Sequence, residues 1–379
     1  MEERLMSQEP TVQIQEHASR QGMIGHMTLN VPATLNSLTL TMVDQIQSTL
    51  DQWRDRSDIA VILIDGSGDK AFCAGGDVQA LRDSCLASPG GPCDYAETFF
   101  TREYRMNFTL HTYPKPIICW GSGIVMGGGL GILAGCRIRI VTETTRIAMP
   151  EVTIALFPDV GGSWFLNRMP GGTGLFLGLT GASINAGDAL YTGIANRFMS
   201  ADQRPQLLHA LSQVAWTAEP NQNGDLARGV VHSLSLEATQ EVPESLVEQH
   251  RAVIDDICDT DQILTLGVRI KALSDSSDRW LAKAAQGFAN GSPLAARWIA
   301  EQLRRTRHCS LAEVFQAEIV LGTNIMRHPE FSEGVRALLV DKDRSPQWTY
   351  SSLESVPAQV LETFFSPPWT HNPLADLTH

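Results

Sequence analysis

The sequence lacks the patterns that identify several common classes of protein. Its seven cysteines are odd in number and contain no CxxC pair, and its ten histidines form no HExxH motif. We therefore expect a reducing compartment, no disulfide framework and no metal site. No Gly-Lys dipeptide and no complete GxGxxG or GxSxG motif occurs. These absences argue against nucleotide hydrolysis, a Rossmann cofactor and a serine esterase.

Basic residues are also scarce. The chain has 29 Lys and Arg against 42 Asp and Glu, which gives a formal net charge of -13. Because nucleic-acid binding needs a basic surface that displaces counterions, no nucleic-acid partner is expected. A local basic patch for a small anionic ligand is compatible with this charge.

Targeting and membrane segments are not evident. The first ten residues, MEERLMSQEP, contain neither the apolar stretch of a secretory signal nor the Arg- and Ser-rich pattern of a transit peptide. We expect a cytoplasmic protein, with the mitochondrial matrix as the alternative for a processed eukaryotic chain. Residues 117–136 are uncharged and long enough to cross a membrane, but seven of the 20 are glycine. Because glycine disfavours helix, a strand, a turn and a close-packed helix are predicted there, and no membrane association.

The apolar pattern predicts an α/β core followed by helices. Residues 25–29 and the β-branched run 59–64 have the character of strands, whereas the apolar residues from 39 to 53 have helical spacing. Beyond residue 200 the chain becomes more polar and mostly helical in its spacing. We predict a core over residues 1–200 and a mostly helical region over residues 201–379.

Two glycine clusters, at residues 71–77 (AFCAGGD) and 127–129 (GGG), could carry chemistry. Glycine lets a backbone N–H group approach a ligand without an obstructing Cβ. Two such groups aimed at one point can stabilise the oxyanion that forms when a thioester carbonyl is attacked. Taken alone, however, the glycines favour the simpler explanation of tight turns and close helix packing.

A pair of carboxylates, Glu151 and Asp159, is the second candidate feature. Each follows a proline and lies among apolar residues. An acid in such surroundings can have a raised pKa and serve as general acid, general base or nucleophile. Spacing alone favours an N-cap or a loop salt bridge instead.

Together these segments resemble the enoyl-CoA hydratase/isomerase (crotonase) superfamily. The resemblance covers residues 25 to 200 and rests on NVP and LNSL at 30–38, KAFCAGGD at 70–77, KP at 115–116, AMPE at 148–151 and LTG at 179–181. Within the superfamily the chain is most similar to the 3-hydroxyisobutyryl-CoA hydrolases, through FFTREY at 99–104, FPDVGG at 157–162, FSEGVRALLVDKD at 331–343 and SPQW at 345–348. Each motif is weak, but the combination is specific. It implies a spiral of ββα units with C-terminal helices packed against the core.

The resemblance implies roles for the matching residues. In the family pattern the backbone N–H groups of Gly76 and Gly128 form the oxyanion hole, and Glu151 matches the catalytic glutamate. Asp159 matches the aspartate that distinguishes hydrolases from hydratases, and Glu103 matches a substrate-contacting glutamate.

Three further positions are candidates for substrate contact. Lys70 and Lys115, beside the glycine clusters, could bind the phosphates of coenzyme A or be ordinary surface lysines. Asp77 adjoins the first cluster, where holding its own loop is the favoured role. The hydratases carry another glutamate two residues after the triple glycine, where this chain has Gly131.

Three functions are compatible with this pattern. The leading one is hydrolysis of a short branched 3-hydroxyacyl-CoA, expected to be 3-hydroxyisobutyryl-CoA in valine catabolism, with Glu151 as nucleophile or general base. The second is isomerisation or hydration of an enoyl-CoA, and the third is a non-catalytic binding protein. Coenzyme A would enter as part of the substrate, with no separate cofactor. Family members commonly form trimers, so a homo-oligomer is among the expected states.

Overall fold

The computed structural model describes residues 9–238 and 242–378. Its centre is a six-stranded sheet in the order β1-β2-β3-β5-β7-β9, in which β1 is antiparallel to β2 and the other pairings are parallel. A smaller, parallel sheet has the order β4-β6-β8. The larger sheet consists of β1 (Val12–Ala18), β2 (Met23–Leu29), β3 (Ile59–Gly66), β5 (Ile117–Gly121), β7 (Ile138–Val141) and β9 (Arg197–Phe198). The smaller one consists of β4 (Ala71–Cys73), β6 (Ile124–Met126) and β8 (Arg146–Ala148).

Successive strands enter the two sheets in pairs, and each pair leads into a helix. β3 and β4 precede α2 (Val78–Ala87), β5 and β6 precede α4 (Gly128–Gly135), and β7 and β8 precede the 3-10 helix η2 (Glu151–Ile154). In every pair the first strand joins the larger sheet and the second joins the smaller one. The predicted α/β spiral of ββα units is confirmed.

The predicted elements of the core are present. The helix expected between residues 39 and 53 is α1 (Leu40–Arg54), whose first turn is capped by the side chain of Thr39 and whose apolar stripe is buried. All of β3 is buried, as expected for a parallel strand covered on both faces. β1 is an addition to the prediction, because this largely exposed edge strand is too polar to give a strand signal.

The uncharged run at residues 117–136 folds as β5, β6 and α4. Its glycines form turns and a helix face within the core. Among the described residues, no helix is both long enough and apolar enough to span a membrane.

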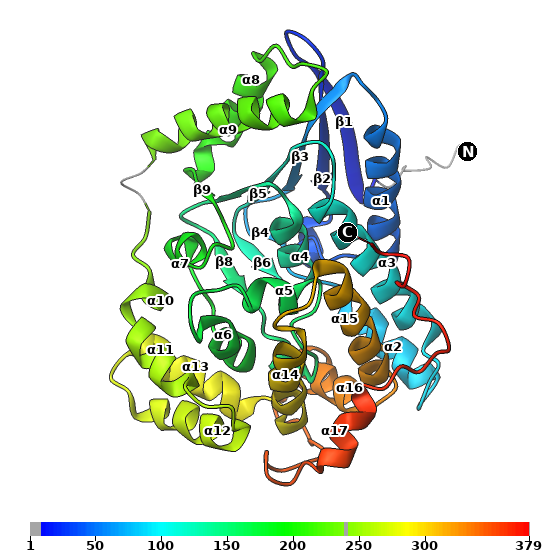
Figure 1. Cartoon of the computed structure of the whole chain (residues 1–379), viewed down its shortest axis with the longest axis vertical. Helices are drawn as coiled ribbons and strands as arrows, with labels where there is room; N and C mark the ends of the chain where they lie inside the picture. The colour runs from blue at the N-terminus through cyan, green and yellow to red at the C-terminus, as the bar shows by residue number, and fades with distance from the viewer. Residues whose placement is uncertain (1–8, 239–241, 379) are drawn as a thin grey trace, which may run out of the picture.

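Helices surround the sheets (Figure 1). α8 and α9 lie over the larger sheet, α10 to α13 gather beside α6, and α15 and α16 pack against α3 and α2. One hydrophobic core continues from Val12 to Leu377 and so crosses residue 200, where the proposed boundary stays a prediction. The remaining helices are η1 (Pro32–Thr34), α3 (Asp94–His111), α5 (Gly162–Leu166), α6 (Thr173–Thr180), α7 (Ala186–Tyr191), η3 (Ala201–Gln203), α8 (Arg204–Ser212), α9 (Pro220–Glu237), α10 (Leu246–Gln249), α11 (Arg251–Cys258), α12 (Ile263–Ala272), η5 (Leu273–Asp275), α13 (Arg279–Asn290), α14 (Pro293–Thr306), α15 (Leu311–Met326), α16 (Pro329–Val335), the π-helical turn η6 (Arg336–Val340) and α17 (Ala358–Phe364).

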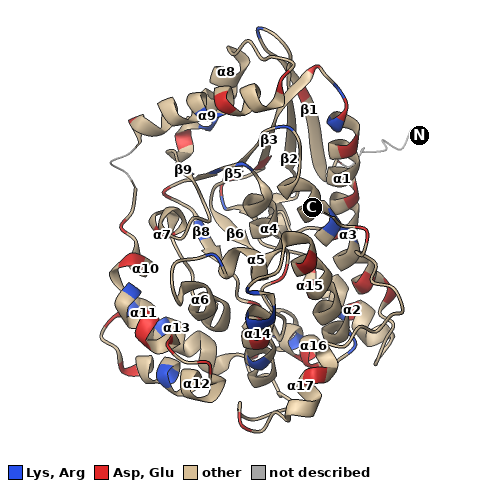
Figure 2. Ribbon diagram, viewed as in Figure 1, with Lys and Arg blue, Asp and Glu red and all other residues tan. Residues whose placement is uncertain are grey.

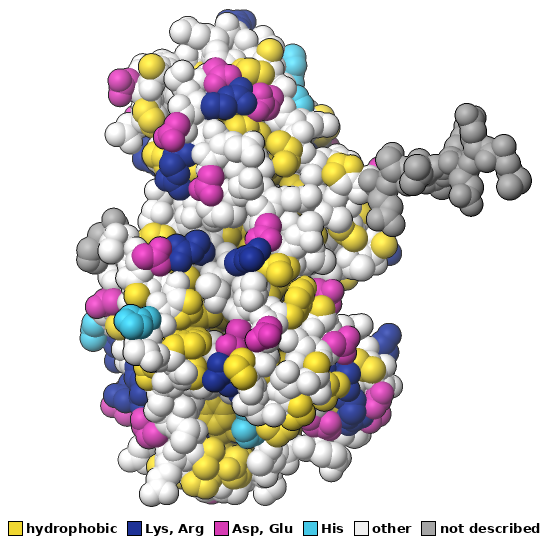
Figure 3. Space-filling model, turned by 90° about the vertical axis from the view of Figure 1, so that its right-hand side faces the viewer, with side chains coloured by type: hydrophobic (Ala, Val, Ile, Leu, Met, Phe, Trp, Pro, Cys, Tyr) yellow, Lys and Arg dark blue, Asp and Glu magenta, His cyan; other side chains and the backbone are white. Residues whose placement is uncertain are grey.

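Charged side chains occupy mainly the outer helices, and few lie on the inner strands (Figure 2). On one face of the molecule, charges of both signs are interspersed with apolar side chains (Figure 3). This mixture differs from the continuous basic surface that nucleic-acid-binding proteins present. All seven cysteines are free.

Candidate active site

The small sheet brings three separate segments of the chain to one edge. Because β4, β6 and β8 are parallel, their carboxyl ends lie on the same side of the sheet. β4 leads into Gly75 and Gly76, β6 leads into Gly127 and Gly128, and β8 leads into Glu151. The strand order therefore explains why the two glycine clusters and a carboxylate meet.

The two glycine turns lie against each other. A Cβ atom built on Gly75 would be 3.8 Å from the nitrogen of Gly128, and one built on Gly127 would be 3.4 Å from the Cα of Gly75. Both Gly75 (φ +111°) and Gly127 (φ +46°) have backbone angles that favour glycine. Gly128 is the first residue of α4, so its N–H group has no acceptor within that helix. The two turns thus bring Gly76 and Gly128 to the wall of one cavity, which an oxyanion hole formed by them requires.

Three carboxylates line a cavity beside these turns. Glu103 on α3, Glu151 on η2 and Asp159 in the loop before α5 are 2%, 5% and 4% exposed. The cavity has a volume of about 210 Å³ and also contains Gly76 and Gly128 in its wall. Most of its remaining wall is apolar: Val78, Leu81, Phe99, Phe100, Met126, Ile154, Leu156, Leu338 and Leu339.

Glu151 and Glu103 both approach the second glycine turn. A Cβ atom on Gly127 would be 3.4 Å from Glu151 Oε1, and one on Gly128 would collide with Glu103 Oε1. Glu151 Oε2 and Glu103 Oε1 are buried and have no hydrogen-bond partner within the described residues. Because buried polar atoms in proteins are nearly always paired, these two oxygens are candidates for contact with a ligand.

Burial sets the ionisation of the three carboxyl groups. It raises the pKa of Glu151 and of Glu103 well above the ordinary range, and the nearby charge of Asp159 adds to both rises. Burial also raises the pKa of Asp159 to about 7, although a hydrogen bond from Tyr104 stabilises the ionised form. Carboxyl groups whose pKa values are raised inside a cavity are suited to acid–base chemistry.

A strained turn presents Asp159 to the cavity. The next residue, Val160, has φ +53°, which is unusual for a β-branched side chain, and Gly161 follows with φ +85°. Tyr104 Oη donates a hydrogen bond of 2.7 Å to Asp159 Oδ2. Strain of this kind persists only where the surroundings hold it.

Glu318, on α15 in the C-terminal region, holds the far side of this turn. Its Oε2 accepts a hydrogen bond from the N–H of Gly161 at 2.8 Å, and its Oε1 accepts one from the N–H of Ser163 at 2.9 Å. Burial raises the pKa of Glu318 to about 8, while these two N–H groups favour the ionised form.

Gly131, the position of the second hydratase glutamate, has no room for a side chain. A Cβ atom there would lie 2.6 Å from the Cβ of Val160 and 3.1 Å from Asn107 Oδ1. Val160 thus fills the space beside Gly131, so the chain has neither the residue nor the volume for a two-glutamate hydratase site.

The other predicted residues lie outside this cavity. Asp77 caps α2 by accepting from the N–H of Ala80, and exposed Lys70 lines a different cavity of about 330 Å³. Lys115 Nζ donates to the carbonyl oxygens of Trp53 and Arg56 at the end of α1, 2.5 and 2.6 Å away. The structure therefore does not bring either lysine to the carboxylates.

Four residues at the site had no role assigned from the sequence. Tyr104 lies within a recognised motif, but its bond to Asp159 joins segments 55 residues apart. Glu318 is an acidic residue inside an otherwise apolar stretch of helix, and that isolation was the one available signal. Leu338 and Leu339 lie in the C-terminal motif, which gave no indication that they reach the cavity.

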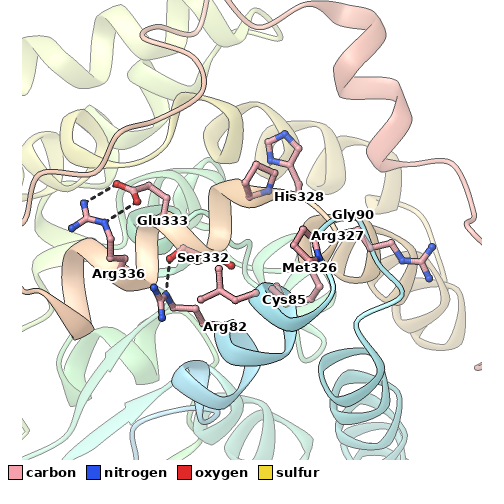
Figure 4. A pocket seen from close by; sticks show the side chains of 12 residues that line it. Arg82, Cys85, Gly90, Met326, Arg327, His328, Ser332, Glu333 and Arg336 are labelled. Atoms are coloured by element: carbon pink, nitrogen blue, oxygen red, sulfur yellow. Dashed lines mark hydrogen bonds and ion pairs between the residues drawn. The ribbon is translucent and has the colours of Figure 1, made fainter.

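A second, larger cavity of about 370 Å³ lies between α2 and α16 (Figure 4). Arg82 Nε donates to the carbonyl oxygen of Ser332, and Arg336 forms an ion pair with Glu333. Burial raises the pKa of the Cys85 thiol in its wall to about 12, which makes that thiol a poor nucleophile. The reactive groups are therefore assigned to the smaller cavity.

The chain is similar to known proteins along most of its length. A family model described as "Enoyl-CoA hydratase/isomerase" matches residues 24–365. The "3-hydroxyisobutyryl-CoA hydrolase, mitochondrial" of Gallus gallus is 35% identical over 92% of this chain and 88% of its own length. The "Small ribosomal subunit protein mS47" of Neurospora crassa is 34% identical over 89% of this chain and 68% of its own length. The crystal structure of an enoyl-CoA hydratase from Rhodobacter sphaeroides 2.4.1 superposes with a TM-score of 0.80 and 32% identity, covering 95% of this chain and 98% of that one.

Proposed function

The chain belongs to the enoyl-CoA hydratase/isomerase family, and from this premise we propose that it hydrolyses the thioester of a short branched 3-hydroxyacyl-CoA, with 3-hydroxyisobutyryl-CoA as the expected substrate. The observation that carries the proposal is the position of Glu151 Oε1 next to Gly127, and hence beside the place where the N–H of Gly128 would hold a carbonyl oxygen. A carboxylate at the carbonyl carbon serves acyl transfer. Hydration would need paired acid–base groups at the double bond, and Gly131 cannot supply the second one.

The site is compatible with two routes for Glu151. As nucleophile, the ionised form of Glu151, which burial makes less stable and hence more reactive, attacks the carbonyl carbon. The C–S bond breaks, coenzyme A leaves as the thiolate, and water then hydrolyses the mixed anhydride. As general base, it removes a proton from a water molecule that attacks the same carbon. In both routes the N–H groups of Gly76 and Gly128 stabilise the oxyanion. Each turnover consumes one water and yields the free acid and the free thiol.

Asp159 and Glu103 complete the proposed site. Asp159 shares the cavity with Glu151 and has a pKa near neutrality, so it is suited to binding the substrate hydroxyl or exchanging a proton with the leaving thiolate. Glu103 Oε1 is unpartnered and lies against Gly128, so it is suited to contacting the acyl group.

The volume of the cavity supports a short acyl group. A cavity of about 210 Å³ is small beside the several hundred Å³ of a drug-sized ligand site. Coenzyme A is proposed as part of the substrate, with no separate cofactor. Lys70 remains a candidate for contact with a phosphate of coenzyme A because it lines an open cavity. Lys115 is no longer a candidate, because its Nζ already donates to two backbone carbonyl oxygens.

The compartment is part of the proposal. The Gallus gallus relative is named as a mitochondrial enzyme. That name supports the mitochondrion over the cytoplasm if the chain comes from a eukaryote, whereas the place in valine catabolism stays a prediction from the resemblance. The oligomeric state stays a prediction from the resemblance.

A non-catalytic assembly protein is the second candidate, because one relative is named a ribosomal protein. An assembly protein has no need for buried carboxylates. Retention of Glu103, Glu151 and Asp159 around one cavity, with raised pKa values, favours catalysis.

The test is release of coenzyme A thiol from 3-hydroxyisobutyryl-CoA, measured with a thiol-reactive dye. We expect Glu151→Gln to lower kcat by roughly 10²-fold or more while the protein stays folded. Glu330→Gln is the matched control, because Glu330 is equally buried but bonds Ser292 and Thr349 outside the cavity. Absence of thiol release from a folded wild-type protein that binds coenzyme A would contradict hydrolysis.

A further inference from the structure

The loop that carries Asp159 is held from behind by a carboxylate far away in sequence. Glu318 is fully buried on α15, and its two oxygens accept hydrogen bonds from the N–H groups of Gly161 and Ser163. These N–H groups begin just two residues after Asp159. Within the described residues Glu318 has no ion pair with Lys, Arg or His, and its hydrogen-bond partners are these two backbone N–H groups and the side chain of Ser163.

The loop needs such a restraint. Between Asp159 and Gly161, Val160 has a positive φ that a β-branched residue rarely adopts. α5, which follows, is only five residues long and supplies little helix stability of its own. A loop relaxed to an ordinary φ at Val160 would change the direction of Asp159.

The same helix supports the loop by packing. Phe315, one turn before Glu318, lies with its ring edge 3.2 Å from the position of a Cβ atom on Gly161. Its ring also lies 6.1 Å from that of Tyr104, the donor to Asp159. α15 therefore contacts the loop and the hydrogen-bond partner of Asp159 together.

A buried carboxylate is a costly way to cap a short helix. Serine or asparagine is the usual residue for that purpose, and burying an unpaired charge is unfavourable. A carboxylate offers two acceptors on one rigid group, which can fix two consecutive parts of the turn at once. A glutamate at this position is therefore explained if the direction of Asp159 depends on the conformation of the turn that follows it.

We infer that Glu318 is a positioning residue for the active site, whose carboxylate clamps the N–H groups of Gly161 and Ser163 and so fixes the direction of Asp159. This inference rests on the proposed thioester hydrolysis. Glu318 itself touches neither the cavity wall nor a reacting atom. It acts through Asp159.

The first test is Glu318→Gln, which preserves the size of the side chain but replaces one acceptor with an N–H donor. Hydrolysis of 3-hydroxyisobutyryl-CoA should show kcat lowered by about 10- to 100-fold, the effect expected of a misplaced catalytic group, with KM changed by less than about threefold. The matched control is Asp188→Asn. Asp188 is also fully buried and also accepts from two backbone N–H groups, those of Asn185 and Val247, but it lies away from the cavity.

A double-mutant cycle separates positioning from general destabilisation. If Glu318 acts through Asp159, Asp159→Asn combined with Glu318→Gln should be no slower than Asp159→Asn alone. If the double variant loses kcat by the product of the two single losses, the inference is overturned. It is also overturned if Asp188→Asn loses as much kcat as Glu318→Gln. If Glu318→Gln does not fold, Glu318→Asp takes its place, and the same loss of kcat and the same result in the double variant are expected.

Hydrogen exchange of the amides gives a readout that does not depend on activity. The N–H groups of Gly161 and Ser163 should exchange at least tenfold faster in Glu318→Gln, and no faster in Asp188→Asn, because a lost hydrogen bond exposes them to local opening. Unchanged exchange would overturn the clamp even if hydrolysis is confirmed. Faster exchange in a protein without thiol release would leave the clamp standing and remove only the proposed function.

Discussion

Strands carry the two glycine turns and Glu151 to the cavity, whereas residues 315–339 reach the cavity, or the loop behind it, by helical side chains. β4, β6 and β8 place backbone N–H groups and Glu151 at a sheet edge, where neighbouring strands fix their spacing. α15 and η6 contribute Phe315, Glu318, Leu338 and Leu339. The strands of the core therefore position the groups that are proposed to react. The C-terminal helices support the loop of Asp159 and supply part of the apolar wall. Changes in the first region should therefore affect kcat most, and changes in the second should be smaller or act through the first.

The largest effect should come from Gly128→Ala in the core. The added methyl group would collide with Glu103 Oε1 and lie 3.0 Å from a methyl group of Leu38. Displacing one oxyanion donor should lower kcat by roughly 10²- to 10³-fold in the thiol-release assay. Gly229→Ala is the control, because nothing lies within 4 Å of its Cβ position on α9. A similar loss in both variants would contradict an oxyanion hole at Gly128.

Asp159→Asn should lower the activity but raise the stability of the protein. Its folded pKa of about 7 lies above the value in the unfolded chain, so ionisation destabilises the fold. This penalty is absent below about pH 4, grows as the pH rises to about 7 and is constant above that. Asp159→Asn removes it, and should raise the free energy of unfolding by about 1–3 kcal/mol at pH 8 with little change at pH 4. Denaturant unfolding at both pH values provides the measurement, and equal effects at the two would contradict a raised pKa.

The pH dependence of kcat/KM should show the same group. If ionised Asp159 is required, kcat/KM falls about tenfold for each pH unit below the pKa of about 7. The profile of Asp159→Asn should lack the step near pH 7 and retain only a step that belongs to Glu151, whose pKa burial also raises. Glu318→Gln should retain the step at reduced activity, because the clamp positions Asp159 without replacing it. Persistence of the step in Asp159→Asn would assign it to another carboxyl group of the cavity.

The limits of sequence reasoning follow the same division. α1, β3 and the turn within residues 117–136 depend on local apolar spacing and glycine, and they were predictable. The sheet edge then brings Gly76, Gly128 and Glu151 together, as the family resemblance implies. Glu318 meets Gly161 across 157 residues, and no local pattern records that contact. Lys115 was a candidate for phosphate contact or an ordinary surface lysine, and its position beside a glycine cluster could not reveal its bonds to the end of α1.

The smallest effect should come from Leu338→Ala in η6. Leu338 lines the cavity but is 38% exposed, so it lies at the mouth and not at the carboxylates. Loss of part of one apolar contact should raise KM for 3-hydroxyisobutyryl-CoA by about two- to tenfold with kcat nearly unchanged, since a contact made equally in the ground and transition states affects binding alone. Val340→Ala is the matched control, because Val340 is 45% exposed on the same turn but does not line the cavity. A large fall in kcat for Leu338→Ala would place the C-terminal region among the groups that act on the transition state, and the division between the two regions would fail.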